Sequence, residues 1–164
     1  MNPQLAMSAR AATRADSGNI ARIYNQGIED RVATFETRPR TAADVENWFD
    51  AKHPIIVVEQ AGEVVAFAST STYRPRECYA GIAEVSVYVA RERRGCGAGR
   101  LALSALFDAA RAARFHKLVS RVFPENSASL RMTGALGFRE VGVYRRHGQL
   151  DGAWRDVVIV EKLL

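Results

Sequence analysis

The sequence predicts one α/β domain with a mixed β-sheet. Its 164 residues, 48% of them hydrophobic, can form one compact core and are too few for two ordinary domains. Two helical patterns come first, β-branched strands follow, and two strand-to-helix units lead to a final pair of strands. Neither a repeat nor a low-complexity linker divides the chain. We therefore expect a single domain at residues 11–164 after a loose tail at residues 1–10.

The N-terminal part of the domain has the pattern of a helix pair. A short strand is expected first, at residues 11–14. The first helix then begins at a cap formed by Asp16 or Ser17, because apolar residues recur at helical spacing after it. Thr41 and Asp44 form a capping-box pattern that begins the second helix.

Alternating and β-branched patterns predict the central strands. Residues 55–60 and 64–72 form an antiparallel pair because a short turn joins them. Residues 80–89 form the next strand, with Glu84 on one face and small or valine side chains on the other.

The C-terminal half alternates helices and strands. A clear apolar stripe predicts a helix at residues 99–114. A strand at residues 117–123 and a short helix at residues 127–136 follow, and residues 138–145 and 154–163 are the closing strands.

Composition limits the environment of the protein. Apolar runs such as residues 55–58 and 157–160 contain only four residues, whereas a membrane span needs about 20, and the N-terminus lacks the apolar segment of a secretory signal. Two cysteines, Cys78 and Cys96, are too few for a disulfide framework and lack metal-ligand spacing with the three histidines. We expect a cytoplasmic protein with reduced thiols, no metal and no membrane partner.

The basic residues gather in one place. A net charge of +5 and a pI near 9.6 suit a nucleic acid or a small polyanion. Arg91, Arg93, Arg94 and Arg100 lie around three glycines, which favours a local anion site. A nucleic-acid binder would instead need arginines and aromatics along an exposed groove, and a solvated turn is the third reading.

Residues 93–100, Arg-Arg-Gly-Cys-Gly-Ala-Gly-Arg, join a predicted strand to a predicted helix. Glycines allow tight turns that point N–H groups inward, and a helix N-terminus adds positive potential, so the segment suits a phosphate or pyrophosphate. The Gly-Lys-Ser/Thr of a P-loop and the early Gly-x-Gly-x-x-Gly of a dinucleotide fold are absent from the sequence. The segment resembles the GNAT acetyltransferase superfamily, whose signature Arg/Gln-x-x-Gly-x-Gly/Ala is matched by residues 94–99.

The resemblance covers nearly the whole chain and is greatest to the phosphinothricin and arsinothricin N-acetyltransferase group. Residues 83–89, 124–129, 135–138 and 152–156 carry it, besides the glycine segment. It implies the GNAT fold, a mixed and mostly antiparallel sheet of about seven strands flanked by about four helices. It also implies acetyl-CoA as cosubstrate and a homodimer, although the sequence itself shows no interface.

In this family the strand before the glycine segment separates from its neighbour and hydrogen-bonds the pantetheine arm. The resemblance places Val87, Tyr88 and Val89 there. Asn126 and Ser129 would reach the same arm, although capping a helix is an equally compatible role for Asn126. The pyrophosphate would be held by Arg94, Gly95, Cys96, Gly97, Ala98, Gly99 and Arg100.

Acetyl transfer to an amine needs a general base, because aliphatic ammonium groups are mostly protonated at neutral pH. Glu84 is the best candidate, since it lies mid-strand beside the cofactor segment, where partial burial would make it a better proton acceptor. The resemblance assigns the same role; a structural glutamate held by an arginine is the alternative. A backbone N–H near Val87 could donate to the oxyanion. Thr133 replaces the tyrosine that many relatives use as acid, so the thiolate leaves unprotonated or takes a proton from water.

The loop before this strand contains Arg74 and Arg76, which can bind carboxylate or phosphinate oxygens in a bidentate manner. The resemblance places them in the substrate site, with Phe35 and Tyr88 as walls. A core or dimer contact is the other reading of Phe35, and a solvated side chain that of Arg74. Leu150 stands where relatives usually have a lysine, which weakens any transfer of substrate preference.

The leading hypothesis is acetyl transfer from acetyl-CoA to a small amine with an acidic group, of the phosphinothricin, arsinothricin, methionine sulfone or methionine sulfoximine type, in detoxification or resistance. Acetylation of protein N-termini or polyamines is the alternative reaction, although the loop arginines would repel polyamines. A CoA-binding regulatory module would be favoured by a lost base, but Glu84 is present.

Overall fold

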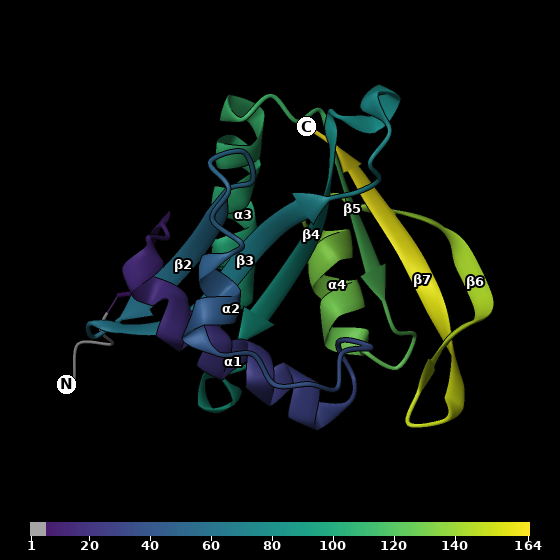
Figure 1. The fold of residues 1–164 in the computed structure, drawn as a ribbon, viewed down its shortest axis with the longest axis horizontal. Helices are drawn as coiled ribbons and strands as arrows, with labels where there is room; N and C mark the ends of the chain where they lie inside the picture. The colour runs from purple at the N-terminus through teal and green to yellow at the C-terminus, as the bar shows by residue number, and fades with distance from the viewer. Residues whose placement is uncertain (1–5) are drawn as a thin grey trace.

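The computed structural model describes residues 6–164, which form one sheet in the order β1-β2-β3-β4-β5-β7-β6 (Figure 1). Only β4 and β5 pair in parallel, and the other neighbours are antiparallel. The predicted mixed sheet of seven strands is therefore confirmed. The strands are β1 (Ser8–Ala11), β2 (Ile55–Gln60), β3 (Glu63–Thr72), β4 (Ile82–Val89), β5 (Lys117–Val122), β6 (Arg139–Leu150) and β7 (Ala153–Leu163).

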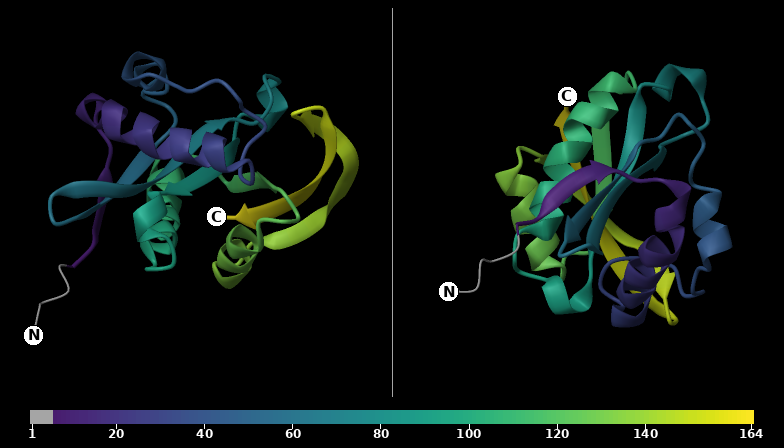
Figure 2. Two further views of the ribbon diagram at one scale, coloured as in Figure 1. Left: turned by 90° about the horizontal axis from the view of Figure 1, so that it is seen from below. Right: turned by 90° about the vertical axis from the view of Figure 1, so that its left-hand side faces the viewer.

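Four α-helices flank the sheet. They are α1 (Ser17–Asp30), α2 (Ala42–Glu46), α3 (Ala98–Ala112) and α4 (Ser127–Ala135). The helices α1 and α2 cover one face and α3 and α4 cover the other (Figure 2). None of the helices described for residues 6–164 is long and apolar enough to cross a membrane.

The first strand lies three residues earlier than expected. The strand forms at Ser8–Ala11 rather than at residues 11–14, so part of the predicted tail belongs to the sheet. Arg10 fixes this strand, because its guanidinium donates to Asp16 and Glu59. The expected domain boundary at residue 11 is therefore wrong, and residues 1–5 lie outside the described part of the chain.

The N-terminal helix caps follow the sequence only in part. Thr41 and Asp44 form the predicted capping box at the start of α2, although this helix has only five residues. Asp16 precedes α1 but makes no side-chain cap bond to it. Its carboxylate instead accepts from the backbone N–H of Thr13 and from Arg10. The hydrogen bond from Arg10 is the main cause that lowers the pKa of Asp16.

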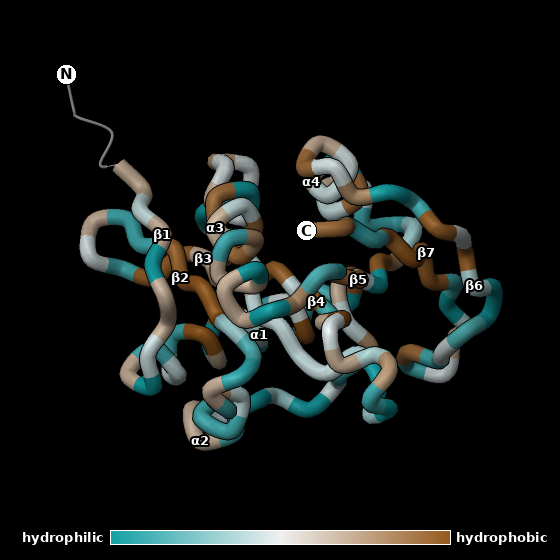
Figure 3. The backbone as a smooth tube through the Cα atoms, turned by 90° about the horizontal axis from the view of Figure 1, so that it is seen from above, coloured by the Kyte–Doolittle hydropathy of each residue, from teal (hydrophilic) through white to brown (hydrophobic). Residues whose placement is uncertain are grey.

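Two hydrophobic cores lie on opposite faces of the sheet. Ile20 and Ile23 of α1 pack with Phe67 of β3 on one face, and Leu103 and Leu106 of α3 lie in the core on the other, all fully buried. Apolar residues dominate the central strands, whereas the edge strand β6 is mainly hydrophilic (Figure 3). The central strands are thus fixed by burial on both faces.

The strands β4 and β5 separate after a short contact. They pair at three positions, the last of which joins Glu84 to Val119. Beyond it, the Ser120 hydroxyl donates to the carbonyl of Val85 at 3.0 Å, and the strands diverge (Figure 1). Because the N–H of Ala90 points toward β3, alternation turns the backbone groups of Val87 and Val89 toward the gap. The predicted separation of this strand from its neighbour is present in the fold.

Candidate active site

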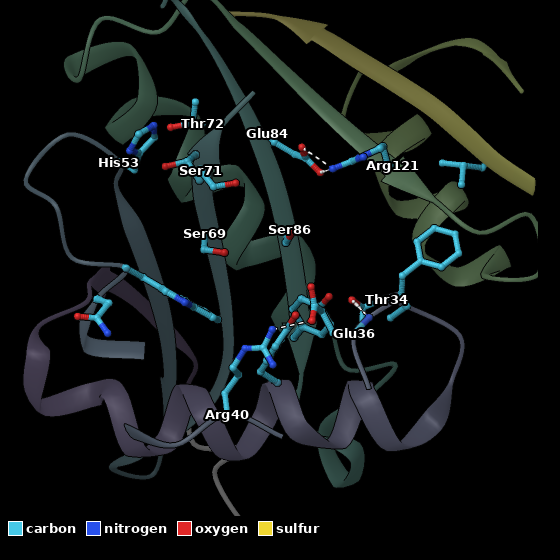
Figure 4. Close-up of a pocket in the computed structure, with 18 of the residues that line it drawn as sticks. Thr34, Glu36, Arg40, His53, Ser69, Ser71, Thr72, Glu84, Ser86 and Arg121 are labelled. Carbon is cyan, nitrogen blue, oxygen red and sulfur yellow. Dashed lines mark hydrogen bonds and ion pairs between the residues drawn. The ribbon is translucent and has the colours of Figure 1, made fainter. Parts of the chain in front are cut away.

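A cleft of about 670 Å³ lies on the face covered by α1 and α2, beside the divergence of β4 and β5. The loop between α1 and α2 forms one wall, and the strands β3, β4 and β5 form the base (Figure 4). The lining includes Tyr24, Thr34, Phe35, Glu36, Arg40, His53, Ser69, Ser71, Thr72, Glu84, Ser86, Tyr88, Arg121, Phe123 and His147.

Glu84 lies in this cleft and is held by an arginine. The guanidinium of Arg121 on β5 donates from Nε to Oε1 and from Nη2 to Oε2, both at 2.9 Å (Figure 4). The side chain of Glu84 is 19% exposed and that of Arg121 is 55% exposed. Glu84 therefore has the position in the cleft expected of a general base, and it also has the arginine contact expected of a structural glutamate.

One feature of the sequence pointed to Arg121, namely its position in an alternating strand pattern. Val119 lies opposite Glu84, so their side chains share a face of the sheet, and Arg121 lies two residues further along β5 on that face. The alternation of side chains along residues 117–123 can be read from the sequence, but the register in which this strand pairs with β4 cannot. A pair 37 residues apart in the chain depends on that register.

Arg40 is a second cation in the cleft, and it is already paired. Its Nη2 lies 2.6 Å from Oε2 of Glu36, and its side chain is only 16% exposed. The hydrogen bond with Glu36 is the largest cause that raises the pKa of Arg40. The guanidinium also lies 5.9 Å from the ring centre of Tyr24. Arg40 therefore stiffens the wall formed by the α1–α2 loop.

Phe35 and Tyr88, the predicted pocket walls, both line the cleft. Tyr88 stacks with Phe67 at a ring-centre distance of 5.4 Å, and burial raises the pKa of its hydroxyl, so it stays protonated at neutral pH. A Cβ at Gly27 would lie 2.8 Å from the Tyr88 ring, so the missing side chain in α1 makes room for it. Phe35 packs edge-on against Phe123, with ring centres 4.7 Å apart.

His53 lines the cleft and received no role from the sequence. Its side chain is 7% exposed, and Nδ1 lies 2.5 Å from Oδ2 of Asp50. Burial acts to raise the pKa of Asp50, but N–H donors from His53 and Lys52 outweigh it and hold the pKa at about 2. Asp50 is therefore an ionised carboxylate that orients the imidazole.

The glycine segment turns from β4 into α3. Gly95 and Gly97 have φ values of 78° and 89°, a left-handed conformation that glycine adopts without strain. A Cβ at Gly99 would lie 3.1 Å from Val89, so this glycine lets α3 approach β4 closely. The exposed loop and the free N–H groups of the first turn of α3 suit a pyrophosphate. Ala98 begins the helix, and the Cys96 thiol donates to the carbonyl of Arg93.

Of the four arginines around this segment, two form ion pairs with an aspartate in the described part of the chain and two do not. Arg94 and Arg91 bind Asp30 at the end of α1, at 2.6 and 2.9 Å. Burial acts to raise the pKa of Asp30, and these two arginines lower it below its usual value. Arg100 is exposed in the first turn of α3, and neither it nor Arg93 forms an ion pair within residues 6–164. Arg93 and Arg100 are therefore the arginines available to an anion.

Asn126 has the capping role that was its alternative reading. Its Oδ1 accepts from the backbone N–H of Ser129 at 3.2 Å, at the start of α4. Thr133 is buried, and its hydroxyl donates to the carbonyls of Ser129 and Leu130. That hydroxyl is therefore engaged inside α4.

Arg74 and Arg76 lie just outside the cleft. Both are exposed, and each lies near a tyrosine of its own loop, Tyr73 and Tyr79 respectively. Their loop directly follows Thr72, which does line the cleft. Their assignment as acid-binding residues stays a prediction.

One end of the cleft is apolar. Leu150 is 2% exposed and packs in a cluster with Phe123 and Val157, both of which line the cleft.

Within residues 6–164, no group of three or more histidine, cysteine or acidic side chains is placed to hold a metal ion.

Comparison with known proteins places the chain in a family. The profile of the Acetyltransferase (GNAT) family matches residues 20–138. The L-methionine sulfoximine/L-methionine sulfone acetyltransferase of Pseudomonas paraeruginosa is 36% identical over 162 residues, which cover 96% of this chain and 94% of that protein.

Solved structures agree in fold. A ribosomal-protein-alanine N-acetyltransferase from Brucella melitensis superposes with a TM-score of 0.91 at 33% identity, over 96% of this chain and 99% of that one. A GNAT superfamily phosphinothricin acetyltransferase from Sinorhizobium meliloti, in complex with AcCoA, gives a TM-score of 0.88 at 29% identity, over 96% and 88%. With the separated strand, the glycine turn and the carboxylate between them, these matches lead to one conclusion: the chain belongs to the GNAT family of acetyltransferases.

Proposed function

We propose that this protein transfers an acetyl group from acetyl-CoA to the α-amino group of a small, amino-acid-like acceptor that carries an acidic group. The observation that carries the proposal is the position of Glu84, a carboxylate in the cleft at the last paired position before β4 leaves β5. A base at that point lies between a cleft for the acceptor and an open strand edge for the donor.

The donor side fits acetyl-CoA. The backbone groups of Val87 and Val89 face the gap between the strands, where they can hydrogen-bond an amide-rich pantetheine arm. The left-handed Gly95 and Gly97 and the start of α3 suit its pyrophosphate, with Arg100 beside them. Acetyl-CoA supplies the acetyl group as a thioester, and the Sinorhizobium meliloti structure holds the same molecule.

Three residues then bear on the transfer step in different ways. Glu84 takes the proton that the acceptor's ammonium group must lose before its nitrogen can attack the acetyl carbon. The N–H of Val87 faces the gap and can donate to the acetyl oxygen as charge develops there. The Thr133 hydroxyl is engaged within α4, so the departing thiolate takes its proton from water or leaves without one.

The acceptor class follows from the cleft and the relatives. A phosphinothricin, arsinothricin, methionine sulfone or methionine sulfoximine would place its ammonium at Glu84 and its apolar chain against Phe35 and Tyr88. Arg74 and Arg76, in the exposed loop that follows Thr72 of the cleft, would bind a distal acidic group of the acceptor. The biological purpose would be resistance to such an analogue. The cytoplasmic location and the homodimer stay predictions.

The test is release of free CoA with acetyl-CoA and a panel of acceptors: phosphinothricin, arsinothricin, methionine sulfone, methionine sulfoximine, spermidine and a short peptide. We expect turnover of at least one amino-acid analogue and none of spermidine. Acetyl-CoA binding without turnover of any panel member would contradict the proposed acceptor class.

The short peptide tests a second candidate. The name of the Brucella melitensis enzyme favours a protein N-terminus as acceptor. Preferential turnover of an alanine-initiated peptide would establish that reaction in place of the first.

A further inference from the structure

We infer that Arg121 binds the α-carboxylate of the acceptor, and that in doing so it releases Glu84 to act as the base. The inference rests on the proposed function and identifies how the site selects α-amino acids. In the structure Glu84 and Arg121 are paired with each other. A zwitterionic acceptor would exchange this one ion pair for two, its ammonium binding Glu84 and its carboxylate binding Arg121.

The pairing geometry makes an exchange necessary. Both oxygens of Glu84 accept from Arg121, at 2.9 Å each, and Nη2 also lies 2.7 Å from Oε1. A carboxylate held in this bidentate manner has both oxygens occupied, so an incoming ammonium group must compete with the guanidinium for them. An ammonium group can therefore transfer its proton efficiently only after Arg121 has moved.

Arg121 is free to make this movement. Its side chain is 55% exposed, whereas that of Glu84 is 19% exposed, so the guanidinium can swing while the carboxylate keeps its place. An ion pair with a partner this exposed contributes little net stability, so breaking it costs little. Figure 4 shows Arg121 reaching Glu84 from β5, across the point where the two strands separate.

The charges of an α-amino acid match the pair. One carbon separates its ammonium from its carboxylate, so a nitrogen at Glu84 brings the carboxylate to the neighbouring guanidinium. A plain amine would bind Glu84 and leave Arg121 without an anion, which costs binding energy. Arg40, the other cleft arginine, is a poorer partner, because Glu36 holds it at 2.6 Å and its side chain is only 16% exposed.

The test compares methionine sulfone with its α-carboxamide, which keeps the amine and side chain but lacks the carboxylate charge. In the wild-type protein we expect kcat/KM for the acid to exceed that for the amide by about 100-fold, the size of a charge-assisted bidentate contact. Arg121→Gln should lower kcat/KM for the acid about 30-fold or more, mainly through KM, and leave the amide unchanged or faster. In Arg121→Gln the ratio of kcat/KM for the acid to that for the amide should therefore fall to a few-fold. Using a ratio cancels the different basicity of the two amines.

Two control variants make the result specific. Arg121→Lys keeps the charge and should retain part of the discrimination. Arg139→Gln removes another exposed strand arginine that pairs with a glutamate, Glu161, and lies outside the cleft, so acid and amide kinetics should both match the wild type. Equal acetyl-CoA affinity in all variants will show that Arg121→Gln is folded.

The outcomes separate the two proposals. An unchanged acid-to-amide ratio in Arg121→Gln, or an equal loss for both acceptors, overturns the role of Arg121 while the proposed function stands. A wild-type protein that acetylates no α-amino acid at all overturns the proposed function, and the inference with it.

Discussion

At the scale of single residues, the site depends on Glu84 and on what surrounds it. The sequence placed this glutamate on a strand otherwise made of small and apolar residues, and the structure puts it in the cleft with a guanidinium on both oxygens. The candidate base could be found by its chemistry. Its partner could not, because the contact joins two strands whose relative register no local pattern determines.

Replacing Glu84 by Gln should lower kcat about 100-fold or more, because the amide cannot accept the ammonium proton. The affinity for acetyl-CoA should change little, since Glu84 lies on the acceptor side. Steady-state kinetics and calorimetric titration with acetyl-CoA measure the two effects. Unchanged turnover would remove Glu84 from the role of base.

A lysine, the residue that the family resemblance predicts at position 150, cannot simply replace Leu150. The side chain is 2% exposed and packs with Phe123 and Val157. Leu150→Lys would bury an ammonium without a partner, and we expect it to lower the free energy of unfolding by about 2–4 kcal/mol. Leu150→Met, which nearly conserves volume, should cost under about 1.5 kcal/mol. Urea titrations give both values; equal stability of the two variants would mean that the lysine reaches solvent.

At the scale of elements, patterns that depend on burial were predicted well. The strands β2 and β3, the two faces of β4, and α3 appear within a few residues of their expected bounds, because each combines a clear period with a buried face. The glycine segment was also recognisable, since its φ values require glycine at two positions.

Elements with a weak apolar signal were predicted at shifted or shortened bounds. The strand β1 consists of small and polar residues, SARA, and is fixed by the ion pairs of Arg10. The strand β6 continues to Leu150 although residues 146–149 are polar. Its register shifts between Tyr144 and Gly148, and Arg146 has a φ of 47°. Irregular pairing of this kind leaves no alternation for sequence reasoning to detect.

Gly97→Val should weaken acetyl-CoA binding at least tenfold. A β-branched residue at a φ of 89° strains the turn that presents the N–H groups of α3. Gly62→Val is the matched control, because Gly62 has a φ of 77° in the β2–β3 turn, far along the chain from the anion segment. Both variants should lose stability, but only Gly97→Val should lose acetyl-CoA affinity in calorimetry; normal affinity there would contradict the assignment of the glycine segment.

At the scale of the whole molecule, paired carboxylates tie the fold to pH. The pKa values of Asp16, Asp30 and Glu161 are lowered by arginine or lysine partners, and that of Asp50 is about 2. A carboxyl group whose pKa is lower in the folded state stabilises the fold above its unfolded pKa, near 4, and that stability is lost as the pH falls through the folded value. The ion pairs thus stabilise the fold at neutral pH.

We expect the free energy of unfolding to be nearly constant from about pH 7 to about pH 5 and to fall between about pH 4 and about pH 2. Asp50→Asn should reduce this acid-induced loss in the free energy of unfolding by no more than about 1 kcal/mol, because the Asp50 side chain is 45% exposed and solvent screens its contacts. Urea unfolding followed by circular dichroism at each pH measures the profile. A flat profile would show that these pairs contribute nothing.

The divergence of β4 and β5 has a consequence for the mechanics of the protein. The sheet consists of a four-stranded lobe and a three-stranded lobe, β1 to β4 and β5 to β7, joined along a seam of three residue pairs. A pantetheine arm lying in the gap would bridge both lobes and lengthen that seam. A ligand that binds only the folded state stabilises it by mass action, so acetyl-CoA at a hundred times its dissociation constant should raise the free energy of unfolding by about 2.7 kcal/mol. Amide exchange should slow on both sides of the gap. The cosubstrate would then stabilise the contact between the two parts of the sheet as well as donate the acetyl group.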